Sequence, residues 1–237
     1  MKPTLIVDAD DTLWENNIYY EQCNAAFVEL MVAQGFGQEE AERTVDAVER
    51  ERIPQVYAPE EYGRSLLIAY QRLCQSHDRP VEDEVVDAVW EIGQAVIEYP
   101  IVLLDSVAET LARLSGPCRL LLLTKGVQET QESKLARSGL GHFFDGVHIV
   151  PEKDAEVIRG LLAHYGLEPE KTWMVGNSPR SDINPALEVG IGAIYVPHPN
   201  TWQLEHEEIA EPEQVIVLNG FGELAALFPN AEGRQKA

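Results

Sequence analysis

The sequence predicts an α/β fold, a doubly wound parallel sheet with an α-helical segment inserted after the first strand. The first observation is a series of short apolar runs, rich in Val, Ile and Leu and without polar alternation, as in strands buried on both faces of a parallel sheet. The second is that amphipathic helical patterns separate the later runs. The six predicted strands are residues 4–7, 119–123, 147–150, 172–175, 193–196 and 215–218.

Helices are expected between the later strands. Ser106 and Glu109 have the spacing of a capping box, and Val107, Leu111 and Leu114 then fall on one stripe of a helix. The same reasoning predicts three further helices, over residues 128–138, 155–165 and 182–188.

A long helical region interrupts this alternation. After Leu13 no strand-like run occurs until about Ile101, and Leu66, Tyr70 and Leu73 share one helical face within this region. The sequence therefore predicts two domains, an α/β core of residues 1–14 and 99–237 and a helical domain of residues 15–98.

Composition excludes several classes of protein. The 237 residues include 40 acidic and 18 basic side chains, a net charge of −22, but 45% are hydrophobic, which is typical of a globular protein. Phosphate backbones are bound by Lys and Arg, so we expect neither a nucleic acid nor an anionic membrane as a partner.

No apolar run reaches the roughly 18 residues of a membrane span. We expect a cytoplasmic protein, because the N-terminal residues do not resemble a signal peptide and the three cysteines lack metal-type spacing. The sequence carries no signal for an oligomeric state.

Polar residues follow each of the first four predicted strands. Ligands of such sheets bind beyond the carboxyl ends of the strands, so these side chains are expected to converge on one edge. The candidate residues are Asp8 and Asp10, Thr124, Lys125 and Gly126, Lys153, and Asn177 with Asp182.

Crowded carboxylates repel one another, and a divalent cation relieves the repulsion. Oxygen ligands from Asp8, Asp10 and Asp182 favour Mg²⁺, which also accepts a phosphate oxygen. We expect Thr124 and nearby backbone N–H groups to hold the phosphoryl oxygens, and Lys153 to balance the charge of Asp8 and the phosphate. Lys125 and Gly126 complete the expected phosphate-binding set.

The ordered motifs resemble those of the haloacid dehalogenase superfamily, in its phosphatase branch with a helical cap after the first strand. They are Asp8-Ala9-Asp10-Asp11-Thr12-Leu13, then Thr124, then Lys153, then Gly176-Asn177-Ser178 through Asp182. The resemblance implies a Rossmann-like core, a nucleophilic Asp8 that becomes an aspartyl phosphate, and Asp10 as the general acid and base. It also implies that Asp10 binds the metal through its main-chain carbonyl.

One departure from the family concerns the metal. The fourth motif commonly has Asp where this chain has Asn177. An amide can still offer an oxygen, so the expected ligands are Asp8, Asp10, Asn177 and Asp182, with a weaker affinity for Mg²⁺ than an additional carboxylate would give.

The sequence thus favours a Mg²⁺-dependent phosphatase acting on a small phosphorylated metabolite. One alternative is a dehalogenase, which has an aspartate nucleophile but no use for an acid and base at Asp10. Another is a phospho-accepting receiver, which would need an aspartate where this chain has Thr124. A third is an inactive relative that serves as a binding protein, against which the complete set of motifs argues.

Overall fold

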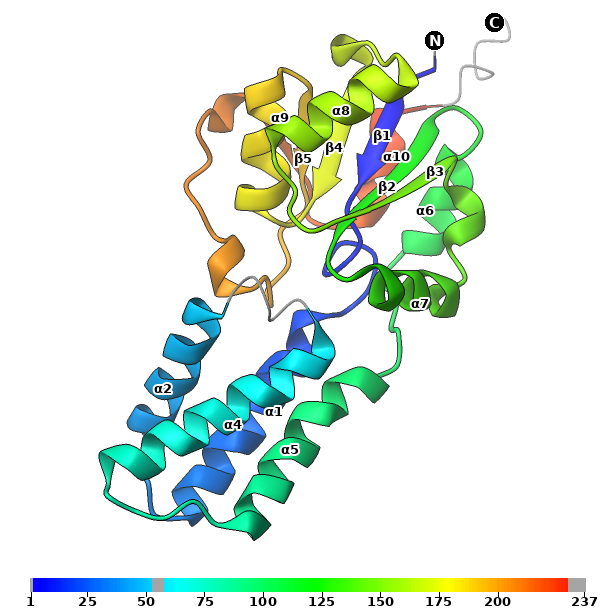
Figure 1. The fold of residues 1–237 in the computed structure, drawn as a ribbon. Helices are drawn as coiled ribbons and strands as arrows, with labels where there is room; N and C mark the ends of the chain where they lie inside the picture. Colours follow the sequence, from blue (N-terminus) through cyan, green and yellow to red (C-terminus); the bar gives the residue numbers. More distant parts are fainter. Residues whose placement is uncertain (1, 53–57, 230–237) are drawn as a thin grey trace, which may run out of the picture. The chain divides into compact units, whose positions relative to one another are not determined.

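A six-stranded, fully parallel sheet lies at the centre of one of two compact units in the computed structural model, which describes residues 2–52 and 58–229. This unit contains the described residues up to Asn17 and from Ile101 onward. The strand order is β3-β2-β1-β4-β5-β6, so β1 lies between β2 and β4 (Figure 1). The prediction of a doubly wound parallel sheet is confirmed. The strands are β1 (Thr4–Val7), β2 (Arg119–Lys125), β3 (Gly146–Val150), β4 (Thr172–Gly176), β5 (Gly192–Tyr195) and β6 (Val215–Val217).

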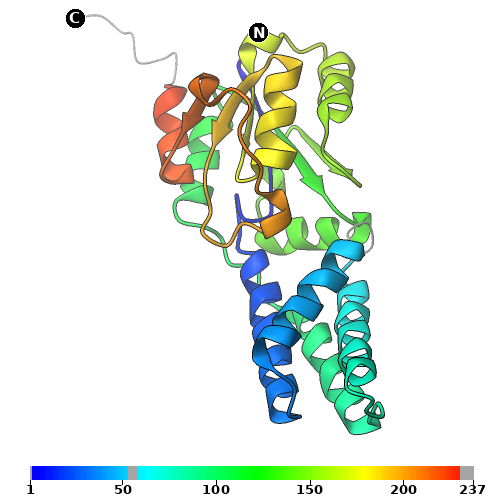
Figure 2. The ribbon, with the colours of Figure 1, turned by 90° about the vertical axis from the view of Figure 1, so that its left-hand side faces the viewer.

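Helices cover both faces of this sheet because successive side chains of each strand point to opposite sides. Leu5 and Val7 belong to an apolar cluster with residues of α6 and α10, whereas Ile6 packs with residues of α8 and α9. Figures 1 and 2 show α8 and α9 on the face opposite α6 and α10. The helices of this unit are α6 (Val107–Leu114), α7 (Gln128–Ser138), α8 (Ala155–Tyr165), α9 (Asn184–Val189) and α10 (Leu224–Leu227).

Two local predictions need correction. Ser106 does not cap α6, because its backbone is left-handed (φ 63°) and its side chain makes no capping hydrogen bond. The predicted helix over 182–188 begins earlier, with the π-helical turn η3 (Pro179–Ile183), and continues as α9. Ser178 caps this turn by accepting a hydrogen bond from Ser181 N.

The second compact unit, Ile18–Pro100, is helical. Its described helices are α1 (Asn17–Ala33, which starts one residue before the unit), α2 (Gln38–Glu51), α4 (Pro59–Ser76) and α5 (Asp83–Glu98). Their apolar faces meet in one core that includes Phe27, Met31, Leu66 and Leu73. The stripe of α4 predicted from the sequence is therefore buried.

Among the described residues, no helix has both the length and the apolar character needed to cross a membrane.

Helices α4 and α5 approach each other closely at two glycines. A Cβ atom added to Gly93 would lie 2.3 Å from the Cα of Gly63, well inside the contact distance of two carbon atoms. The packing of these helices therefore depends on the absence of a side chain at this crossing.

We expect Gly93→Ala to lower the free energy of unfolding by about 1–3 kcal/mol, because the new methyl group forces the helices apart. Gly160→Ala is the matched control, since a Cβ at this exposed position in α8 meets no atom within 4 Å. This control should be neutral or stabilising by up to about 1 kcal/mol, through helix propensity alone. Urea unfolding of both variants measures the difference, and equal stabilities would contradict the prediction.

Candidate active site

A buried lysine joins two carboxylates at the carboxyl ends of the central strands. Lys153 Nζ donates to Asp8 Oδ1 and to Asp182 Oδ1, both at 2.5 Å. The three side chains are almost entirely buried, with exposed fractions of 4%, 6% and 0%. The sheet brings them together because Asp8 follows β1, Lys153 follows β3 and Asp182 lies in the turn after β4.

The turn after β4 directs Asp182 back over the end of its own strand. Asp182 Oδ2 accepts a hydrogen bond from Ser178 N at 3.0 Å. A Cβ atom at Gly176 would lie 2.2 Å from this same carboxylate oxygen. Glycine at position 176 is thus required for Asp182 to occupy this position.

Burial and neighbouring charges together shift the pKa values of Lys153 and Asp182. Burial opposes the charge on Lys153, but Asp182 and Asp8 outweigh this effect and raise its pKa. Burial raises the pKa of Asp182 to about 7, and the charge of Asp8 adds to this, while Lys153 opposes it. Burial thus disfavours the charged form of Asp182 even beside Lys153, and additional positive charge would stabilise that form.

Thr124 and Gly126 lie at the end of β2, beside this group of charges. The buried Thr124 hydroxyl has no hydrogen-bond partner among the residues that the structure describes, so it is available to a ligand oxygen. Gly126 has φ 142°, and its N–H already donates to Val150 O at 2.9 Å. The N–H of Gly126 is therefore already used within the sheet and is not a free donor for a ligand.

The carboxylate of Asp10 is anchored by residues that the sequence reasoning did not identify. It accepts hydrogen bonds from Trp14 Nε1 (2.7 Å), Gln131 Nε2 (2.9 Å) and Lys134 Nζ (2.9 and 3.0 Å). Burial alone would raise the pKa of Asp10, but the Lys134 charge and these hydrogen bonds lower it overall. Gln131 and Lys134 are three residues apart in α7, a spacing that places both on one helix face and could have indicated a shared target.

The Asn177 amide lies among the oxygens that were predicted to bind the metal. One of its two terminal atoms is 3.2 Å from Asp8 Oδ2 and 3.2 Å from the main-chain oxygen of Asp10. With nitrogen at this position, the amide donates to both oxygens, and its own oxygen accepts from Thr201 Oγ1. With oxygen there, three oxygens converge, which is an arrangement that a cation stabilises.

The donor set fits a Mg²⁺ ion. It consists of oxygens from two buried carboxylates, one main-chain carbonyl and one amide. Magnesium prefers hard oxygen ligands of this kind. The residues that would hold it are Asp8, Asp10 through its carbonyl, Asn177 and Asp182.

A second buried network lies beside the first. Glu205 comes from the short turn η4 (Gln203–Glu205) after β5 and is buried. It forms an ion pair with Lys125 and accepts hydrogen bonds from Ser178 Oγ at 2.6 Å and from Ser181 Oγ. The sequence from Glu205 to Glu213 is rich in acidic residues and so predicts a solvated surface, and for Glu205 this prediction is wrong.

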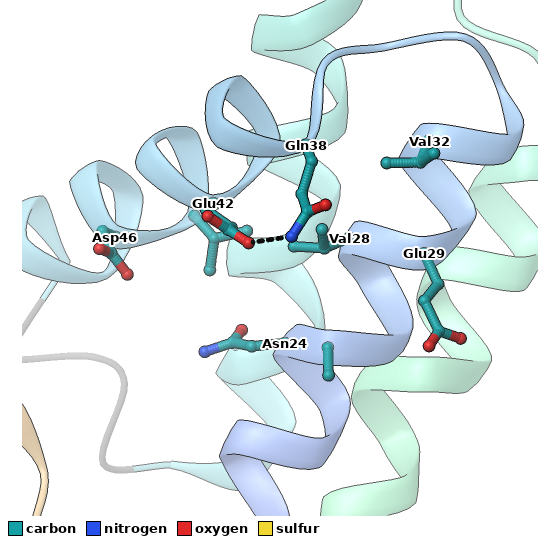
Figure 3. Close-up of a pocket in the computed structure, with 9 residues that line it drawn as sticks. Asn24, Val28, Glu29, Val32, Gln38, Glu42 and Asp46 are labelled. Atoms are coloured by element: carbon teal, nitrogen blue, oxygen red, sulfur yellow. Dashed lines mark hydrogen bonds between the residues drawn. The ribbon is translucent and has the colours of Figure 1, made fainter.

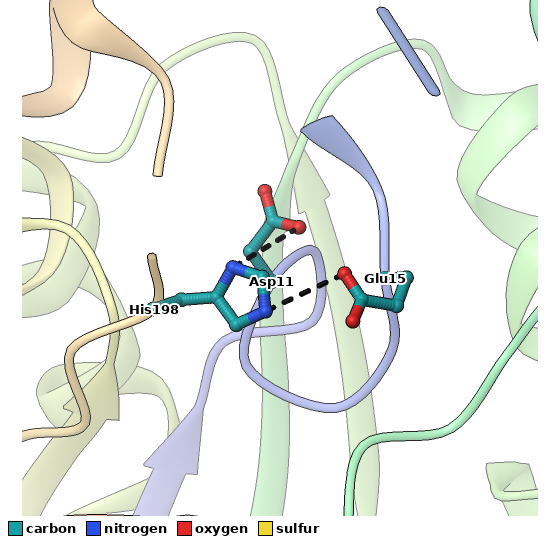
Figure 4. Close-up of side chains that lie close together, drawn as sticks. All are labelled: Asp11, Glu15 and His198. Carbon is teal, nitrogen blue, oxygen red and sulfur yellow. Dashed lines mark ion pairs between the residues drawn. The ribbon is translucent and has the colours of Figure 1, made fainter. Parts of the chain in front are cut away.

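The loop after β5 also contacts the loop after β1 through the side chains of His198, Asp11 and Glu15 (Figure 4). His198 Nδ1 lies 3.8 Å from Asp11 Oδ1, and His198 Nε2 lies 3.4 Å from Glu15 Oε2. Asp11 also accepts hydrogen bonds from the N–H groups of Asn16 and Asn17. Burial and the charge of Asp10 raise the pKa of Asp11 to about 7. The hydrogen bonds of Asp11 thus hold the loop after β1 in place.

A hollow of about 520 Å³ lies elsewhere, within the helical unit (Figure 3). Residues of α1 and α2 line it, including Asn24, Val28, Glu42 and Asp46. None of the predicted site residues lies among its lining residues.

Comparison with known proteins places this site in a family. A model of the haloacid dehalogenase-like hydrolases matches residues 2–190. A glyceraldehyde 3-phosphate phosphatase of Methanothermobacter thermautotrophicus is 26% identical over 205 residues, covering 83% of this chain and 86% of the relative. A phosphoserine phosphatase of Thermus thermophilus is 37% identical, but over only 82 residues, covering 32% of this chain and 33% of the relative.

Solved structures agree with this assignment. A haloacid dehalogenase-like family hydrolase from Xanthomonas campestris has a TM-score of 0.76 and 25% identity, covering 95% of this chain and 94% of that one. The HAD-hydrolase YfnB from Bacillus subtilis has a TM-score of 0.61 at 18% identity and so shares the fold. The family match over most of the chain confirms the resemblance seen in the motifs, and the protein belongs to the haloacid dehalogenase-like hydrolases.

Proposed function

We propose that the protein is a Mg²⁺-dependent phosphatase that hydrolyses a small phosphomonoester through an aspartyl phosphate on Asp8. The observation that carries this proposal is the buried contact of Lys153 with both Asp8 and Asp182, at the edge where the Thr124 hydroxyl has no partner among the described residues. The similarity to glyceraldehyde 3-phosphate phosphatases along most of the chain supports it.

In the first step, a carboxylate oxygen of Asp8 attacks phosphorus, and the bond from phosphorus to the alcohol oxygen breaks. Thr12 Oγ1 donates to Asp8 Oδ2 at 2.8 Å, which orients the carboxylate. Lys153 offsets the negative charge of Asp8 and of the incoming phosphate, and Thr124 donates to a phosphoryl oxygen. Bound Mg²⁺ would supply further positive charge next to the phosphate oxygens.

Asp10 serves as the acid and then as the base. It protonates the departing alcohol oxygen, and later takes a proton from the water that hydrolyses the aspartyl phosphate. Its contact with Lys134 and its lowered pKa keep it ionised, which suits the second step. For the first step Asp10 has to carry a proton, so Lys134 favours its role as base over its role as acid.

We further propose that the helical domain, predicted over residues 15–98, is a cap that excludes water and selects the substrate. Deletion of these residues should then change the ratios of kcat/KM across a panel of phosphomonoesters, including glyceraldehyde 3-phosphate and phosphoserine. Unchanged ratios in a soluble core would contradict the cap role.

Asp8→Asn should lower the rate of phosphate release by at least about a thousandfold, because an amide is a poor nucleophile. The measurement is hydrolysis of an aryl phosphate with Mg²⁺ and with EDTA. Asp105→Asn, at an exposed aspartate of the same unit, is the matched control and should keep full activity. Retained activity in Asp8→Asn would rule out this nucleophile. Release of halide from a 2-haloacid without metal, and no release of phosphate, would favour the dehalogenase alternative.

Asn177→Asp should tighten Mg²⁺ binding by about tenfold, because it adds a negative charge to the ligand set. Calorimetric titration with Mg²⁺ and the Mg²⁺ concentration for half-maximal activity both report this change. Asn200→Asp adds the same charge in the loop after β5 and controls for charge alone. The prediction fails if Asn177→Asp binds Mg²⁺ no more tightly than the unaltered protein.

A further inference from the structure

The ion pair between Lys125 and Glu205 lies at the carboxyl ends of the strands around β1, the strand that Asp8 follows. Lys125 ends β2 and Ser178 follows β4, while β1 lies between these two strands. Glu205 contacts Lys125 with Oε1 and the hydroxyls of Ser178 and Ser181 with Oε2. One carboxylate from the loop after β5 therefore links the ends of two strands on either side of Asp8.

This link continues to Asp182. Ser178 N donates to Asp182 Oδ2 at 3.0 Å, and Asp182 N donates to Ser178 O at 3.0 Å. Ser178 thus bonds to Glu205 through its hydroxyl and to Asp182 through its backbone. A displacement of Glu205 would be transmitted to the turn that holds Asp182 over β4.

The ion pair between Lys125 and Glu205 is also largely buried. The side chain of Lys125 is 10% exposed and that of Glu205 is 11% exposed. The Lys125 ammonium also lies 3.3 Å from Ser181 Oγ, so both ends of the ion pair contact the same turn. A buried carboxylate with a cation and two hydroxyl donors has a fixed geometry, because each lost contact would leave a polar group unsatisfied.

We propose that Lys125 and Glu205, with Ser178 and Ser181, form a brace that positions Asp182 for binding the metal, so that Lys125 is a positioning residue rather than a phosphate ligand. This inference rests on the proposed function, since it assigns Mg²⁺ to Asp182. It revises the expectation that Lys125 binds the phosphate, because its ammonium is directed to Glu205 and Ser181.

Two substitutions distinguish a brace from a simple charge effect, because the two explanations predict different directions of change in Mg²⁺ affinity. Glu205→Gln removes a negative charge and Lys125→Met removes a positive one. If only charge mattered, the first would weaken Mg²⁺ binding and the second would strengthen it. If the brace positions Asp182, both variants weaken Mg²⁺ binding, by about tenfold, and the double variant binds no more weakly than the weaker single one.

Calorimetric titration of each folded variant with Mg²⁺ alone is the principal measurement, and kcat, KM and inhibition by inorganic phosphate are measured beside it. The brace predicts a lower kcat for both variants, with changes of less than about threefold in KM and in the inhibition constant of phosphate. Glu168→Gln and Lys171→Met are the matched controls, because they disrupt an exposed ion pair of the same unit, and neither should change any of these values. If Glu205→Gln does not fold, Ser181→Ala removes a single hydroxyl and should weaken Mg²⁺ binding in the same direction by a smaller factor.

Opposite shifts of Mg²⁺ affinity in the two variants, or no shift in either, would overturn the brace. So would a Lys125→Met variant that binds phosphate much more weakly while Glu205→Gln binds it more tightly, since Lys125 would then be a phosphate ligand. An unaltered protein that binds Mg²⁺ and releases phosphate keeps the proposed function in place in all these cases. An unaltered protein that does neither refutes the proposed function, and the brace with it.

Discussion

The contact of Lys153 with Asp8 and Asp182 is the interaction on which the organisation of this site depends. Three charged groups are removed from water here, and their mutual attraction has to offset a large cost of desolvation. It depends above all on Lys153, because the loss of this one cation would leave both carboxylates buried without an opposite charge. The parallel sheet makes this possible, since it brings the ends of β1, β3 and β4 to one edge.

The net charge of −22 is compatible with a phosphorylated ligand because the site has its own local charge balance. Charges at the surface are screened over about 8 Å at physiological salt. A phosphate at the edge of the sheet would meet Lys153 and the Thr124 hydroxyl rather than the average acidity of the protein. Burial, with a smaller effect from the charge of Asp8, raises the pKa of Asp182, and a divalent cation beside it would favour its charged form.

Sequence patterns predicted the sheet and the ends of its strands because both depend on short-range features. A buried parallel strand appears as an apolar run, and Asp8 or Thr124 follows such a run directly. The anchoring of Asp10 by Lys134 could not be predicted in this way, because it depends on how α7 is oriented across the end of β1. Glu205 was missed since it lies in a three-residue turn without periodicity, within a stretch whose charges suggested solvent. The capping prediction at Ser106 failed because spacing alone does not specify the backbone angles that a cap requires.

The missing side chain at Gly176 has a consequence for how this protein can vary. The space that a methyl group would fill there is taken by the carboxylate of Asp182, so even the smallest substitution competes directly with that group. Gly116 and Gly220 differ from Gly176, because an added Cβ at either position meets no atom within 4 Å. The end of β4 therefore couples the identity of residue 176 to the position of the Asp182 carboxylate.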